Sequence, residues 1–97
     1  MSKKLRTPAM DLLMAGIVSI ESVDEAYAFF EDLCTVGELE AMKQRFEVAA
    51  LLRKDTTYQV IEEKTGASSA TISRVNRALN YGNDGYDLII KKLDSKK

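Results

Sequence analysis

Hydroxyl and guanidinium side chains are concentrated in one short stretch of the second half of the chain. After Gly66 the sequence continues Ala-Ser-Ser-Ala-Thr-Ile-Ser-Arg-Val-Asn-Arg77, and no acidic residue occurs from Gly66 to Asn83. Groups of these two kinds donate hydrogen bonds to phosphate oxygens and to base edges, which is the chemistry of DNA recognition. The same residues would also suit helix caps and a solvated helix face, so the surrounding elements must decide between the two interpretations.

Residues 57–80 have the spacing of a helix-turn-helix, with helices expected at 58–65 and 69–81 and a turn at Gly66. Two helices that cross steeply need apolar side chains at fixed places along the unit. Counted from Tyr58, the fourth, tenth, fifteenth and eighteenth places are Ile61, Ala67, Ile72 and Val75. Glu62 at the fifth place departs from the pattern, and we expect it at the rim of the unit.

The second helix of this unit supplies the candidate DNA contacts. A recognition helix enters the major groove with its N-terminal residues, so Ser69, Ala70 and Thr71 are expected at base edges. Its later residues are better placed for phosphates. The predicted DNA-binding residues are Gln59, Ser68, Ser69, Ala70, Thr71, Ser73, Arg74 and Arg77.

Four further helices are predicted, and no segment alternates as a strand would. Thr7-Pro8 is a helix-start signal, and two capping boxes, Ser22 to Glu25 and Thr35 to Glu38, begin the next two helices. The expected ranges are 8–20, 23–34, 36–54 and 86–93. The fold class is therefore all-α, with a flexible N-terminal arm at 1–7 and a single helical domain at 8–97.

Aromatic residues and the one cysteine are expected to be structural. Tyr81 and Tyr86 flank the loop 82–85, and we expect them to pack the last two helices together rather than to stack on bases. Buried positions are expected for Phe29, Phe30, Phe46 and Cys34.

Composition narrows the function classes. With one cysteine and no histidine among 97 residues, neither an intramolecular disulfide nor a zinc site is expected. No nucleophile–base pair is evident, so we expect no enzyme activity, no metal and no cofactor. The apolar run 12–20 is too short to cross a bilayer, which predicts a cytoplasmic protein without a membrane partner.

The charge is unevenly distributed, although the net charge is only −1. Eight acidic residues and no lysine or arginine lie between Thr7 and Met42. Such asymmetry matters more for phosphate attraction than the total does. The helix at 36–54 is apolar on most of its sides, so it needs neighbours on most sides, and this predicts a homodimer.

The residues resemble those of the Trp repressor superfamily, and within it the YerC/YecD branch. The resemblance covers nearly the whole chain after residue 8 and rests on four segments: Phe30-Glu-Asp-Leu-Cys-Thr35, Glu38-Leu-Glu-Ala-Met42, Gly66 to Arg77 and Leu79-Asn-Tyr-Gly-Asn-Asp-Gly-Tyr86. It implies a six-helix subunit in an intertwined homodimer that presents its helix-turn-helix units to successive major grooves of a palindromic operator. It also implies a transcriptional regulator, with repression as the expected outcome.

In the Trp repressor two arginines hold the effector, tryptophan. Arg74 matches the second of them, and Arg45 is the nearest candidate for the first, although an ungapped count from the turn places Gln44 there. Val75 stands where the repressor has a glycine, and Ala78 where it has a serine. These departures argue against tryptophan and leave open another small-molecule effector, or none.

A second hypothesis is a protein-interaction module that keeps the helix-turn-helix scaffold without binding an operator. The acidic N-terminal half and Glu62 favour it. In the resemblance, Glu62 falls where the repressor has a phosphate-binding lysine, and Gln59 replaces an arginine.

Overall fold

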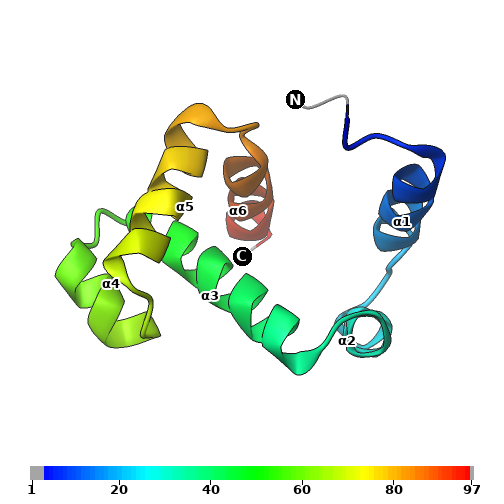
Figure 1. Ribbon diagram of the computed structural model, residues 1–97, viewed down its shortest axis with the longest axis horizontal. Coiled ribbons are helices and arrows are strands. Elements are labelled where there is room, and N and C mark those ends of the chain that lie inside the picture. Colours follow the sequence, from blue (N-terminus) through cyan, green and yellow to red (C-terminus); the bar gives the residue numbers. More distant parts are fainter. Residues whose placement is uncertain (1–3, 97) are drawn as a thin grey trace. The chain divides into compact units, whose positions relative to one another are not determined.

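The computed structural model describes residues 4–96, which form six α-helices and no strand (Figure 1). The helices are α1 (Pro8–Val18), α2 (Val23–Leu33), α3 (Val36–Leu52), α4 (Tyr58–Thr65), α5 (Ser69–Tyr81) and α6 (Gly85–Ser95). The predicted all-α class is confirmed. Of the expected arm 1–7, residues 1–3 lie outside the described part. Within that part, no helix combines the length and the apolar character that a membrane span requires.

Hydroxyl caps begin most of these helices, as the sequence predicts. The hydroxyl oxygens of Thr7 and Ser22 accept hydrogen bonds from backbone N–H groups three residues later, each at 3.1 Å. Thr35 and Glu38 form a reciprocal capping box, in which the Thr35 N–H donates to Glu38 Oε1 at 2.8 Å and the Glu38 N–H donates to Thr35 Oγ1 at 3.1 Å. These hydrogen bonds, the backbone one foremost, lower the pKa of Glu38 below its ordinary value. Each cap satisfies N–H groups that the helix itself leaves without partners.

Four helices differ from the expected ranges, and α2 differs least, since it ends at Leu33 rather than residue 34. α1 ends at Val18 rather than residue 20, where the Ser19 hydroxyl donates to the Gly16 carbonyl at 2.7 Å. α3 ends at Leu52 rather than residue 54, just before Asp55 adopts the left-handed conformation with a φ of 57°. α6 begins at Gly85, after Asp84 at a φ of 62°, and continues to Ser95. Side-chain competition for backbone groups and local backbone turns, which the apolar pattern does not report, set these ends.

The chain divides into two compact units, which we call the N-terminal unit (Met1–Leu39) and the C-terminal unit (Glu40–Lys97). The C-terminal unit contains a hydrophobic core, and Figure 1 shows α4, α5 and α6 gathered around the part of α3 that belongs to it. The buried residues are Val48, Ala49, Ile61, Ala67, Ile72, Val75 and Leu79, and the partly buried residues packed against them are Leu51, Leu52, Tyr86 and Ile90.

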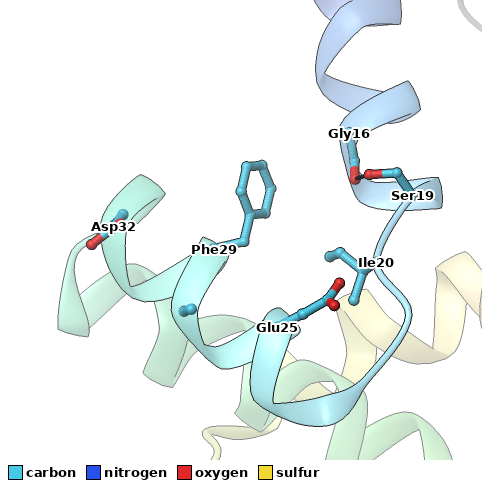
Figure 2. A pocket seen from close by; sticks show the side chains of 7 residues that line it. Gly16, Ser19, Ile20, Glu25, Phe29 and Asp32 are labelled. Atoms are coloured by element: carbon cyan, nitrogen blue, oxygen red, sulfur yellow. Dashed lines mark hydrogen bonds between the residues drawn. The ribbon is translucent and has the colours of Figure 1, made fainter.

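None of the described residues of the N-terminal unit is buried. Phe29 and Phe30 form an edge-to-face pair with ring centroids 5.4 Å apart, but both are half-buried, as are Phe46 and Cys34. The expectation that these four side chains are buried is therefore wrong for the single chain. An open hollow of about 420 Å³ lies in the N-terminal unit, and Figure 2 shows the Phe29 ring bordering it with Ile20 and Glu25. Helices form here without a core to hold them together.

Candidate nucleic-acid interface

The four residues that the spacing predicts to face inward in the helix-turn-helix are buried. Ile61 and Ile72 are 0% exposed, Val75 is 1% exposed and Ala67 is 3% exposed. Glu62 is exposed, as expected of a rim position. Because all four inward side chains are buried, the crossing of α4 and α5 belongs to the core of the C-terminal unit.

The turn between α4 and α5 depends on Gly66, whose φ of 72° is left-handed and strained for other residues. Its N–H donates to the Glu62 carbonyl at 2.9 Å and closes α4. Thr65 fixes the turn from the other side: its hydroxyl donates to the Ile61 carbonyl at 2.7 Å and accepts from the Ala67 N–H at 3.1 Å. The direction in which α5 leaves the turn is thus set by three hydrogen bonds.

The outer face of α5 is open to solvent. Its inward residues Ile72, Val75 and Leu79 are buried, whereas the side chains on the other face are exposed. The exposed residues are Ser69, Ala70, Ser73, Arg74, Arg77, Asn80 and Tyr81, while Thr71 is half-buried. Among the predicted DNA-binding residues outside α5, Ser68 and Gln59 are also exposed. The predicted residues are therefore accessible to solvent apart from the half-buried Thr71, with six of them on α5 and Gln59 on the neighbouring helix α4.

Ser68 and Thr71 are connected by two hydrogen bonds at the start of α5. The Ser68 hydroxyl accepts from the Thr71 N–H at 3.2 Å, which confirms Ser68 as the cap, and donates to Thr71 Oγ1 at 3.2 Å. A hydroxyl has one hydrogen and two lone pairs. Thr71 Oγ1 therefore accepts the Ser68 hydrogen, and the two residues form one hydrogen-bonded pair at the start of α5.

Two side-chain contacts brace α4 and α5 against the rest of the C-terminal unit. Gln44 on α3 donates from Nε2 to the Thr65 carbonyl at the end of α4, at 3.2 Å. Arg53 holds Asp87 of α6 with two hydrogen bonds, 2.7 Å from Nε to Oδ1 and 2.9 Å from a terminal nitrogen to Oδ2, and also donates to the Leu79 carbonyl at 3.2 Å. The Arg53 guanidinium lowers the pKa of Asp87, and the hydrogen bonds to Asp87 raise the pKa of Arg53. Arg53, the residue directly after α3, thus connects the end of that helix to α5 and α6.

The two tyrosines beside the loop 82–85 have different environments. Tyr86 is half-buried against the core, as expected of a packing residue, but its ring stacks on Phe46 of α3, with ring centroids 6.4 Å apart, rather than on a side chain of α5. The prediction for Tyr81 is wrong, because its side chain is 86% exposed. Leu79 occupies the inward position at this end of α5, and a residue two places later lies roughly 160° around the helix from it.

The residues matched to the repressor's effector site have different environments. Arg45 is half-buried and Arg74 is exposed, while Gln44 is engaged with the Thr65 carbonyl. A polar hollow of about 320 Å³ lies beside Gln44, and neither Arg45 nor Arg74 is among its lining residues, which are Glu40, Ala41, Lys43, Gln44, Glu47, Lys64 and Thr65.

The family comparison decides what this scaffold is. The sequence model of the Trp repressor protein family matches residues 8–94. The chain belongs to the Trp repressor family. It is 50% identical over 90 residues to the uncharacterized protein YerC of Bacillus subtilis (strain 168), covering 93% of this chain and 86% of YerC. It is also similar to the crystal structure of a TrpR-like protein from Eubacterium eligens ATCC 27750, with 57% identity, a TM-score of 0.93 and 96% of each chain covered.

Membership in the Trp repressor family gives the surface of α5 a functional context. The family consists of helix-turn-helix DNA-binding regulators rather than enzymes. In this chain the arginines and hydroxyls that such a regulator needs lie on the exposed face of its second helix-turn-helix helix. DNA binding and transcription regulation are therefore the functions that fold and family both support.

Proposed function

We propose that the chain is a sequence-specific transcriptional repressor that binds a palindromic operator as a homodimer. The observation that carries the proposal is the exposed N-terminal turn of α5, which stands on a buried core and has no carboxylate from Gly66 to Asn83. A rigid helix with an accessible, carboxylate-free tip is what the major groove receives in helix-turn-helix complexes.

Within this proposal the residues of α5 divide into two groups. Ser69, Ala70 and Thr71 contact base edges from the first turn of the helix, and Thr71 offers its remaining hydroxyl hydrogen to a base acceptor. Ser73, Arg74 and Arg77, farther along the exposed face, bind phosphates and fix the helix in the groove. Ser68 and Gln59 contact the DNA backbone at the edge of the surface.

The homodimer in this proposal follows from the unfilled N-terminal unit. Large apolar side chains stay exposed on α1 and α2, including Leu12 at 75%, Val23 at 72% and Tyr27 at 65%. A second copy of the chain would cover them and give the N-terminal unit the core that it lacks. Two recognition helices related by the twofold axis would then meet half-sites one DNA turn apart, roughly 34 Å.

A salt titration of DNA affinity tests the proposal, with Arg74→Ala and Arg77→Ala as variants and Lys92→Ala on α6 as the charge-matched control. Each phosphate contact that is lost should reduce the log–log salt slope by about 0.9, while the control keeps the wild-type slope. Wild-type protein that does not bind duplex DNA at low salt would refute the proposal.

The base contact of Thr71 is tested separately from affinity. Thr71→Ala should cost roughly 1–3 kcal/mol at one base pair and relax the preference there, without changing the salt slope. Thr71→Ser keeps the hydroxyl and should retain the preference. Unchanged base preference in Thr71→Ala, measured by selecting bound duplexes from random sequence, would place the base contacts elsewhere.

Exposed carboxylates on α4 favour a second candidate, a protein-interaction module on the same scaffold. Glu62 and Glu63 are both exposed beside the helix-turn-helix and would repel phosphates. Under this candidate Glu62→Lys would create DNA affinity that the wild-type protein lacks. Under the repressor proposal it would only strengthen binding that is already measurable.

A further inference from the structure

Tyr81 is the feature that neither the core nor the residues discussed above explain. It is the last residue of α5, it is 86% exposed, and its hydroxyl has no hydrogen-bond partner within residues 4–96. The other tyrosine of this region, Tyr86, stacks on Phe46 instead. A helix end that has already buried Leu79 does not need the Tyr81 ring for packing.

Helical geometry aligns Tyr81 with the arginines of α5. Tyr81 lies four residues after Arg77 and seven after Arg74. At 100° and 1.5 Å per residue, its side chain lies roughly 40° around the helix from Arg77 and roughly 20° from Arg74, about 6 Å and 10 Å farther along the axis. Arg74, Arg77 and Tyr81, all exposed, therefore form one stripe along the outer face of α5.

No negative charge on α5 interrupts this stripe. The first acidic residues after it are Asp84 and Asp87, and both interact with Arg53. Tyrosine is among the neutral side chains that donate hydrogen bonds to DNA phosphates. A neutral donor at the end of an arginine stripe adds a phosphate contact without adding a charge.

We infer that the Tyr81 hydroxyl donates a hydrogen bond to a DNA phosphate flanking the one bound by Arg77. The inference rests on the proposed function and extends the DNA surface from the first turn of α5 to its last residue. In this arrangement the two ends of the helix do different work. Ser69, Ala70 and Thr71 read bases, while Tyr81 fixes the angle at which the helix lies in the groove by holding its far end.

The test compares Tyr81→Phe with Arg77→Ala on one duplex that the wild-type full-length chain has selected from random sequence. Tyr81→Phe removes only the hydroxyl and should weaken binding roughly 2- to 12-fold per half-site, as for a neutral hydrogen bond. Its salt slope should equal that of the wild type, because no charge has been removed from a phosphate contact. Arg77→Ala should weaken binding and reduce the slope by about 0.9 for each contact.

Phosphate ethylation interference locates the contact. In the wild type, ethylation of one phosphate beside the Arg77 phosphate should inhibit binding, and in Tyr81→Phe that inhibition should disappear. Thermal unfolding should be the same for both proteins, because an exposed hydroxyl without a partner contributes little to folding.

Three results would overturn the inference while leaving the repressor proposal intact. The first is wild-type affinity in Tyr81→Phe beside a clear loss in Arg77→Ala. The second is a loss only in Tyr81→Ala, which would assign the effect to the ring and not to the hydroxyl. The third is a weakened dimer in sedimentation equilibrium with unchanged DNA affinity at saturating dimer, which would place Tyr81 in a protein interface. Failure of the wild-type chain to bind DNA would instead refute the proposed function itself.

Discussion

Both the N-terminal and the C-terminal unit contain helices with hydroxyl caps, yet the two units bury very different amounts of apolar surface. The Ser22 cap of α2 spans 3.1 Å and the Ser68 cap of α5 spans 3.2 Å. Nevertheless, the C-terminal unit buries seven apolar side chains, whereas the N-terminal unit buries none among its described residues. Ile72 is 0% exposed, while Leu12 and Val18 on α1 are 75% and 83% exposed.

This contrast separates helix formation from helix packing. Caps and apolar spacing act within a few residues, so they produce helices in both units. Packing requires partners that are distant in sequence, and α3, α4 and α5 provide them for one another. α1 and α2 have 11 residues each, a length at which isolated helices are marginal in water. The helices of the N-terminal unit therefore need apolar surface from outside their own unit to cover them, whereas α3, α4 and α5 cover one another.

The largest expected effect comes from removing core volume in the C-terminal unit. Ile72→Ala should lower the free energy of unfolding by about 2–5 kcal/mol, because it deletes buried methyl and methylene groups and leaves a cavity between α4 and α5. Urea unfolding followed by circular dichroism, at one fixed protein concentration, measures the change.

Ile72→Val is the matched control and should cost only about 0.5–1.5 kcal/mol. Equal stability of Ile72→Ala and the wild type would mean that this helix crossing is not the centre of the core, and the contrast between the two units would fail.

The parts of the fold that local chemistry determines were predictable from the sequence. α4 and α5 begin and end at the expected residues, because Thr57 and Ser68 cap their starts and Gly66 ends α4. The inward positions of the helix-turn-helix were predictable for a related reason. A glycine turn fixes the number of residues between the two helices, and with that spacing Ile61 and Ile72 both face the core.

Contacts between distant segments were not predictable in this way. Arg53 and Asp87 are 34 residues apart, and no local pattern connects them. No sequence pattern indicates the Gln44 contact with the Thr65 carbonyl either, since a glutamine on a helix is ordinarily solvated. For Tyr81, aromatic character suggested packing, but its angle on α5 directs it outward. The incomplete burial of Phe29 and Phe30 in the N-terminal unit could not be predicted either, because burial depends on which other side chains cover them.

A charge on α1 tests whether a second copy covers the N-terminal unit. Leu12→Asp should weaken homodimer formation at least about tenfold, because burying a leucine side chain contributes roughly 1.5–3 kcal/mol and a carboxylate in its place would be desolvated. Sedimentation equilibrium of the full chain provides the dissociation constant. Leu12→Met keeps the apolar surface and should associate as the wild type does. A wild-type chain that is monomeric and fully folded at micromolar concentration would show that the N-terminal unit is stable without a second copy of the chain to cover its apolar side chains.

The smallest effect concerns one carboxylate in each unit. The pKa of Asp87 in the C-terminal unit lies below its ordinary value of 3.8 because Arg53 donates hydrogen bonds to it, and the capping box of Thr35 lowers the pKa of Glu38 in the N-terminal unit. A carboxylate with a lowered folded-state pKa stabilises the fold above its unfolded-state pKa, and this stabilisation is lost as the pH falls through the folded-state value. Asp87→Asn should therefore be less stable than the wild type near pH 7, and the difference should begin to shrink as the pH falls below about 3.8 and disappear only below the lowered folded-state pKa. Glu38→Gln is the comparison, because glutamine can still complete a capping box, so its difference in stability from the wild type should be smaller at pH 7.

Amide hydrogen exchange in α5 measures the effect. Followed by NMR from pH 7 down to the onset of acid unfolding, the exchange rates should change in Asp87→Asn and not in Glu38→Gln. Equal responses to both variants would mean that the two units unfold together and that the core of the C-terminal unit is not independent of the N-terminal helices.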